Sequence, residues 1–182
     1  MRDASKRIFA LPAITGLSDT YLLRLELSDK SGKTQSINWY WLSKKGDELN
    51  WKKSNWFTTP QSAYADYSAL QSLPKTKLVV SQTGKAEGGS TSHMVTIKNT
   101  SGAVAFFVHL RALKGQGGDD ILPVIFSDNY ISLAPGESRV IRCTYSTKDA
   151  DGTAPYFLTS AWNLDIAASS GDCGFEDGLP KE

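Results

Sequence analysis

The feature that most restricts the fold of this chain is a series of short apolar runs, separated by turn residues, between Lys75 and Asp165. Seven such runs fall within these 91 residues, and no amphipathic helical pattern lies between them. Short strands at this spacing are typical of a two-sheet antiparallel sandwich, and the missing helices exclude a β/α barrel. The runs are Lys77–Val80, His93–Ile97, Ala105–Arg111, Leu122–Phe126, Tyr130–Leu133, Arg139–Tyr145 and Tyr156–Trp162.

One of these runs alternates clearly enough to assign its two faces. In residues 105–111 the pattern predicts that Phe106, Val108 and Leu110 point into the core. The same pattern places His109 and Arg111 on the outward face, because successive side chains of a strand point to opposite sides.

The remaining residues are expected to form three further parts. Residues 1–43 predict only a hairpin, in which Leu23, Leu25 and Leu27 alternate with charged residues. Two strands are only marginally stable alone, so this part is interpreted as the C-terminal strands of an incomplete sandwich domain. Residues 44–74 are predicted to be an ordered, aromatic-rich connector, and residues 75–165 the complete sandwich. Residues 166–182, rich in Gly, Ser and acidic residues, are expected to be a flexible tail.

Composition and charge narrow the classes of partner. Lysine and arginine number 20 against 19 aspartate and glutamate, a net charge of +1, which argues against a nucleic-acid partner bound by charge. No run approaches the roughly 18 apolar residues that cross a membrane, so no membrane partner is expected. The first residues show no signal peptide. A vacuolar or extracellular location and a cytoplasmic one both stay open.

The acidic residues give no candidate for glycosidic catalysis. Two carboxyl groups must flank the scissile bond, roughly 5–10 Å apart, whereas Asp119 and Asp120 are neighbours in a glycine-rich loop. Asp128 and Glu137 are interpreted as turn and capping residues. We therefore assign no catalytic residue.

Metal, disulfide and modification sites are similarly unsupported. His93 and His109 lack the spacing of metal ligands, so we predict neither a metal nor a cofactor. Cys143 is expected to be a buried free thiol, and no disulfide with Cys173 is assigned. Asn99 begins a formal N-glycosylation sequence, but capping of a turn is the favoured role.

Four tryptophans are the candidate carbohydrate contacts, since flat sugar faces pack on aromatic rings. Their clustering in and before the connector favours a different role, as buried cement between two domains. The four residues are Trp39, Trp41, Trp51 and Trp56.

Several segments resemble the C-terminal immunoglobulin-like domain of family 2 glycoside hydrolases. The branch is that of plant mannosylglycoprotein endo-β-mannosidases and exo-β-glucosaminidases, and the run from Ser127 to Glu137 is the most specific. Residues 21–27 and 38–43 resemble the last strands of the preceding sandwich domain. The segments in the C-terminal domain are residues 95–101, 105–111, 121–124, 127–130, Leu133, 135–137 and 161–163.

The resemblance implies an immunoglobulin-like sandwich that supports a catalytic barrel absent from these residues. The expected partners are that barrel and other domains or subunits of a parent glycosidase, with an oligosaccharide as a further partner. The first expectation for the parent is an endo-β-mannosidase that hydrolyses Manβ1-4GlcNAc in N-glycan-derived oligosaccharides. The alternatives are an accessory domain of a chitosan-degrading exo-β-glucosaminidase or a free-standing carbohydrate-binding module.

Overall fold

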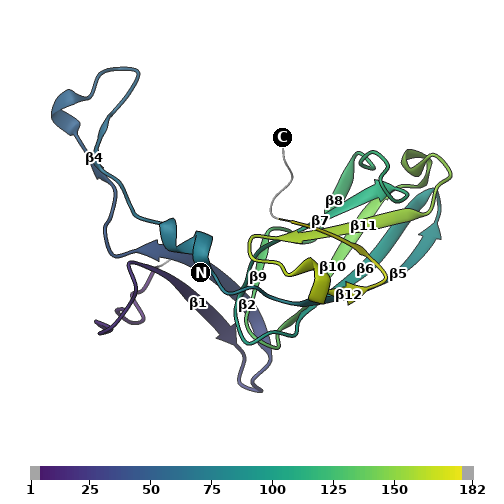
Figure 1. Cartoon of the computed structure of the whole chain (residues 1–182), viewed down its shortest axis with the longest axis horizontal. Coiled ribbons are helices and arrows are strands. Elements are labelled where there is room, and N and C mark those ends of the chain that lie inside the picture. Colours follow the sequence, from purple (N-terminus) through teal and green to yellow (C-terminus); the bar gives the residue numbers. More distant parts are fainter. Residues whose placement is uncertain (1–4, 178–182) are drawn as a thin grey trace. The chain divides into compact units, whose positions relative to one another are not determined.

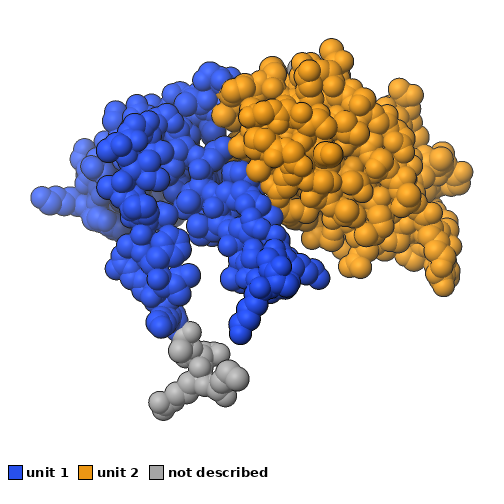
Figure 2. Space-filling model, turned by 90° about the horizontal axis from the view of Figure 1, so that it is seen from below, with its two compact units in different colours: residues 1–72 blue, residues 73–182 orange. Residues whose placement is uncertain are grey.

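The computed structural model describes residues 5–177 and divides the chain into two compact units (Figure 1; Figure 2). Unit 1 comprises residues 1–72 and unit 2 residues 73–182. Within the described residues both units consist of β-strands and short 3-10 turns, which confirms the predicted all-β class. Met1 and the last five residues of the predicted tail, 178–182, lie outside the described residues.

Unit 2 is a sandwich of two sheets, with strand orders β12-β5-β6-β10-β8 and β13-β11-β7-β9. Each of the seven predicted runs contains or overlaps one of the strands β5 to β11, so the predicted immunoglobulin-like sandwich is confirmed. The strands are β5 (Leu78–Glu87), β6 (Ser90–Asn99), β7 (Ala105–Lys114), β8 (Val124–Phe126), β9 (Ile131–Leu133), β10 (Ser138–Ser146), β11 (Pro155–Ala161), β12 (Ser170–Gly171) and β13 (Gly174–Asp177).

The core of unit 2 lies between these two sheets. Alternate residues of each long strand point inward, and each fully buried aliphatic or aromatic side chain contributes roughly 1.5–3 kcal/mol. The largest fully buried apolar residues are Leu78, Val80, Val95, Ile97, Val108, Leu110, Ile121, Leu133, Ile141, Phe157 and Leu164.

Strand β7 contains a bulge that the sequence pattern did not predict. Ala105 pairs with Leu133 and Val108 with Ile131, so β7 contains one more residue than β9 between these two pairs. Phe107 takes a positive φ of 56° at this point. The bulge corrects the predicted faces, because Ala105 and Val108 both enter the core and Phe106 is buried outside it.

The segment predicted as a flexible tail contains two strands, so this expectation was wrong for residues 170–177. Strand β12 runs parallel to β5, and β13 runs parallel to β11. Gly171 lies so close to β5 that a Cβ there would be 1.8 Å from the carbonyl oxygen of Val80. The last described residues therefore belong to the sandwich and cover one edge of each sheet.

Unit 1 begins with the predicted hairpin, formed by β1 (Thr20–Ser28) and β2 (Thr34–Ser43). Its turn is held by Asp29, whose carboxylate accepts hydrogen bonds from the backbone N–H groups of Ser31 and Lys33. Leu25 and Leu27 are 36% and 65% exposed. One apolar face of the hairpin is therefore partly uncovered.

The rest of unit 1 contains a second, smaller hairpin that we call the aromatic arm, residues 44–65. It consists of β3 (Glu48–Leu49), the 3-10 turn η1 (Trp51–Lys53) and β4 (Gln61–Ala63), with the turn η2 (Ser68–Ser72) following it. In Figure 1 the arm carries the β4 label. No residue of the arm is buried, so backbone and side-chain hydrogen bonds rather than a core give it its shape.

Candidate functional site

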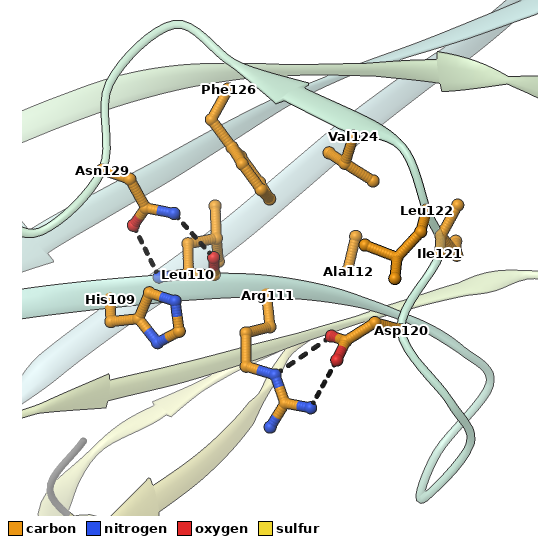
Figure 3. Close-up of a pocket in the computed structure, with 10 residues that line it drawn as sticks. All are labelled: His109, Leu110, Arg111, Ala112, Asp120, Ile121, Leu122, Val124, Phe126 and Asn129. Carbon is orange, nitrogen blue, oxygen red and sulfur yellow. Dashed lines mark hydrogen bonds and ion pairs between the residues drawn. The ribbon is translucent and has the colours of Figure 1, made fainter. Parts of the chain in front are cut away.

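The candidate site is a pocket of about 440 Å³ in unit 2, between β7 and the segment that carries β8 (Figure 3). It lies where β9 has ended and the edge of β7 is no longer covered by a regular strand. Its lining mixes charged, amide and apolar groups: His109, Leu110, Arg111, Ala112, Asp120, Ile121, Leu122, Val124, Phe126 and Asn129.

Asn129 takes the place of a neighbouring strand at one end of the pocket. Its side-chain oxygen accepts a hydrogen bond from the Leu110 N–H, and its Nδ2 donates to the Leu110 carbonyl, both at 2.9 Å. The same oxygen accepts from the Tyr130 N–H at 3.0 Å. The amide oxygen accepts two backbone hydrogen bonds and the amide nitrogen donates one, so the main role of Asn129 is to hold the backbone. The sequence carried no signal for this role.

Arg111 and Asp120 form a two-point ion pair across the pocket (Figure 3). The Arg111 Nε donates to one carboxylate oxygen of Asp120 at 3.0 Å, and Nη2 donates to the other at 2.8 Å. Glu176 lies 3.7 Å from a third nitrogen of the same guanidinium. The hydrogen bond to Asp120 raises the pKa of Arg111, so the arginine stays charged. Asp120, expected in a solvated loop, is instead half-buried and paired.

His109 lies beside this pair and is 8% exposed. The prediction that His109 faces outward is right, because its neighbours Val108 and Leu110 enter the core. The His109 ring is nevertheless covered by Tyr130. The two rings stack at 4.4 Å with an angle of 13°. Burial and the charge of Arg111 lower the pKa of His109, and Asp120 opposes them. The imidazole is therefore neutral near pH 7.

The other histidine, His93, is buried inside the sandwich. Its Nδ1 lies 2.8 Å from the side-chain oxygen of Gln82, and its Nε2 lies 3.3 Å from the Tyr145 hydroxyl. Phe157 meets the ring edge-on at 5.1 Å, and burial lowers the pKa of His93. This is the arrangement of a structural core histidine.

Residues predicted to cap turns do so. The Glu137 carboxylate accepts a hydrogen bond from the Ala134 N–H at 2.8 Å, and the Asp128 carboxylate accepts from the Asn129 N–H at 2.9 Å. Asn99 is fully buried, and its Nδ2 donates to the carbonyls of Ala103, Leu133 and Ala134. These bonds confirm the capping role of Asn99.

Two other classes of site can be assessed on the described part of the chain. Residues 5–177 contain no group of three or more His, Cys, Asp or Glu placed to hold a metal ion. Cys143 and Cys173 are buried free thiols, and burial raises the pKa of each to about 12. In the same residues no helix is long and apolar enough to cross a membrane.

The four candidate sugar-contact tryptophans belong to two different elements of unit 1. Trp39 and Trp41 lie on one face of β2, where Arg24 stands 5.8 Å from the Trp39 ring. Trp51 and Trp56 lie on the aromatic arm and are 71% and 86% exposed. Within this chain no core covers these two rings, so their role as cement between two domains stays a prediction. Sugar contact by the four residues stays a prediction.

Comparison with known proteins identifies relatives of both units. Residues 56–164 match the family model of the exo-β-D-glucosaminidase Ig-fold domain. The chain is 44% identical over 156 residues to an exo-β-D-glucosaminidase of Amycolatopsis orientalis, which covers 84% of this chain and 15% of the relative. The crystal structure of an exo-chitosanase of the same organism matches with a TM-score of 0.80 and 43% identity, over 85% of this chain and 18% of that one.

A plant relative is more distant. The mannosylglycoprotein endo-β-mannosidase of Lilium longiflorum is 35% identical over 85 residues, covering 43% of this chain and 9% of the relative. The matches therefore favour the glucosaminidase alternative over the first expectation of an endo-β-mannosidase. The chain spans only 15–18% of the length of the glucosaminidase and the exo-chitosanase that it matches.

Proposed function

This chain belongs to the family of exo-β-D-glucosaminidase Ig-fold domains, and from this premise we propose that it is a non-catalytic supporting region of a larger exo-β-glucosaminidase. The parent enzyme would release glucosamine from the ends of chitosan chains. The sandwich would pack against the catalytic domain and stiffen the rim of its substrate site. An endo-β-mannosidase parent is the less supported reading, since its relative aligns over a shorter part of the chain.

The observation that carries this proposal is that the carboxylates around the pocket are held by arginines. One carboxyl group of a glycosidase must be protonated to act as the general acid. A carboxylate whose oxygens bind a guanidinium is already engaged by that contact, so its oxygens are not placed to donate a proton to a glycosidic oxygen. The pairs are Asp120 and Glu176 with Arg111, and Asp128 and Glu137 with Arg139.

The hairpin of unit 1 supports the second part of the proposal, that residues 1–43 complete a sandwich formed by other residues of the parent. Both faces of the hairpin carry apolar side chains. Leu23 and Leu25 lie on one face, and Leu22 pairs with Trp41 on the other. A two-stranded sheet has nothing of its own to cover two apolar faces.

The test is a hybrid enzyme in which this chain replaces the matched region of the Amycolatopsis orientalis exo-β-D-glucosaminidase. We expect the hybrid to hydrolyse p-nitrophenyl-β-D-glucosaminide, and the isolated chain to release no p-nitrophenol. As a control, Leu110→Asp places a charge in the core and should abolish the hybrid's activity by unfolding the sandwich. Turnover by the purified isolated chain, or a folded hybrid without activity, would refute the proposal.

A further inference from the structure

The aromatic arm displays an unusual amount of apolar surface for so short a segment. Trp51, Trp56, Phe57 and Tyr64 are 71%, 86%, 75% and 69% exposed. At roughly 150–250 Å² for each aromatic side chain, the exposed area is on the order of 600 Å². Only Trp56 and Phe57 are shown in contact, so this area is a sum over the arm and not one continuous patch. It is still close to the roughly 800 Å² that each partner of a stable protein interface usually contributes.

The arm is held in shape before any partner binds. The Asn55 side-chain oxygen accepts hydrogen bonds from the N–H groups of Phe57 and Thr58, at 2.8 and 2.9 Å. The Trp56 and Phe57 rings are thereby fixed as neighbours, with centroids 3.9 Å apart. At the base, the Asp47 carboxylate accepts from the Ala65 N–H. A preformed surface loses little conformational freedom on binding, which favours affinity.

The polar groups around the rings argue against a sugar as the occupant. Recognition of a sugar needs a few free polar groups to fix its hydroxyls, in addition to a ring for stacking. The Asn55 oxygen is occupied by its own turn, and the Ser54 and Thr59 hydroxyls bond to each other at 2.8 Å. Moreover, the Trp56 and Phe57 rings are tilted by 41° and form no flat platform.

The charge of the arm also argues against a sugar as the occupant. Residues 44–65 hold four lysines, Lys44, Lys45, Lys52 and Lys53, against Asp47 and Glu48, a formal net charge of +2. A positive arm repels the protonated amine of a glucosamine oligomer but attracts an acidic protein surface. It also disfavours a second copy of the same arm, which has the same charge.

We propose that the aromatic arm docks onto another domain of the parent glycosidase, at an apolar surface with an acidic rim. This inference rests on the proposed function. A parent enzyme of the relatives' size would offer a large surface for docking, because the matched region is only 15–18% of the relatives' length. Trp56 and Phe57 are the central anchors of the contact, and the lysines pair with the acidic rim.

The experiment compares the isolated chain with the hybrid enzyme described above by hydroxyl-radical footprinting, with oxidation of each residue read by mass spectrometry. We expect oxidation of Trp56 and Phe57 to fall by at least about fivefold in the hybrid, because the centre of an interface excludes water. The double variant Trp56→Ser/Phe57→Ser should leave the melting temperature of the isolated chain unchanged, because these exposed rings pack on no core. It should lower the melting temperature of the hybrid. It should also return the oxidation of Tyr64, which docking reduces, to the value in the isolated chain. Ile125→Ser, which removes a 73% exposed side chain from unit 2, is the matched control and should leave the oxidation of Tyr64 in the hybrid unchanged.

The possible results separate docking onto another domain from its alternatives and from the proposed function. An active hybrid whose arm stays as reactive as in the isolated chain refutes this inference and leaves the proposed function standing. A folded but inactive hybrid with a protected arm supports the inference and refutes the proposed function. Protection of the isolated chain by glucosamine oligomers alone would show a sugar site, and protection that grows with its own concentration would show self-association. If the hybrid does not fold, the isolated chain is titrated against the separately expressed remainder of the Amycolatopsis enzyme, and the absence of saturable binding refutes docking.

Discussion

Gly84→Ala is the substitution whose effect can be worked out most directly from the structure. Gly84 lies on β5 opposite His93 of β6. A Cβ at Gly84 would lie 2.1 Å from Cε1 and 2.3 Å from Nδ1 of the His93 ring. No carbon atom tolerates such distances, so the imidazole must move.

The cost follows from what holds the ring. Moving it breaks the 2.8 Å hydrogen bond to Gln82 and disturbs the contact with Phe157. Overpacking a core costs about 1–3 kcal/mol and a lost hydrogen bond about 1 kcal/mol, so we expect about 2–4 kcal/mol in total. For a unit of about this size the melting temperature should fall by roughly 10–20 °C.

The assay is urea unfolding followed by circular dichroism, with hydrogen exchange of β6 amides to assign the transition to unit 2. His93→Ala removes the obstacle, so the double variant with Gly84→Ala should cost about 2 kcal/mol less than the sum of the two single variants. Gly102→Ala is the matched control, since its Cβ would meet nothing within 4 Å. Stability of Gly84→Ala within about 0.5 kcal/mol of the wild type, or strict additivity with His93→Ala, would refute the reasoning.

Three further predictions follow from the buried polar and thiol groups. Burial lowers the pKa of His93 and His109 below the ordinary value of 6.5, so the free energy of unfolding should be greatest above about pH 6.5 and fall at lower pH, where both rings are forced to protonate. Urea unfolding at pH 5 and pH 7.5 measures this difference, and equal stability at the two values would contradict it. Cys143 and Cys173 have pKa values of about 12, so a thiol reagent at pH 8 should label them only after unfolding, and rapid labelling of the native chain would count against their burial. Asn99→Ala leaves buried carbonyls without a donor and should cost about 2–4 kcal/mol, whereas Asn99 should carry no glycan in folded protein from a secretory host, as tested by intact mass.

The sandwich could be predicted from the sequence because its strands bury alternate side chains, which leaves a visible pattern. The β7 bulge could not, because the positive φ of Phe107 has no marker in the sequence and shifts the faces of its neighbours. Strands β12 and β13 were missed for a related reason. Ser170, Gly171 and Gly174 pair through their backbones, and small polar residues give no periodic signal.

The candidate site was harder to predict than the fold. His109 was correctly placed beside Arg111, but its burial depends on a stacked ring from the turn before β9, at Tyr130. The tryptophans of the aromatic arm show a different limit of the sequence. Aromatic composition suggested that Trp51 and Trp56 would be buried, whereas tertiary structure alone decides whether a ring is covered.

The two parallel strands at the end of the described chain have a practical consequence for recombinant work. Strand β12 occupies the outer side of β5, and β13 occupies the outer side of β11. A version truncated after Asp165 would expose unpaired N–H and C=O groups on both sheets, and such edges recruit strands from other molecules. It should precipitate or form oligomers at concentrations where a version extending through Asp177 remains monodisperse.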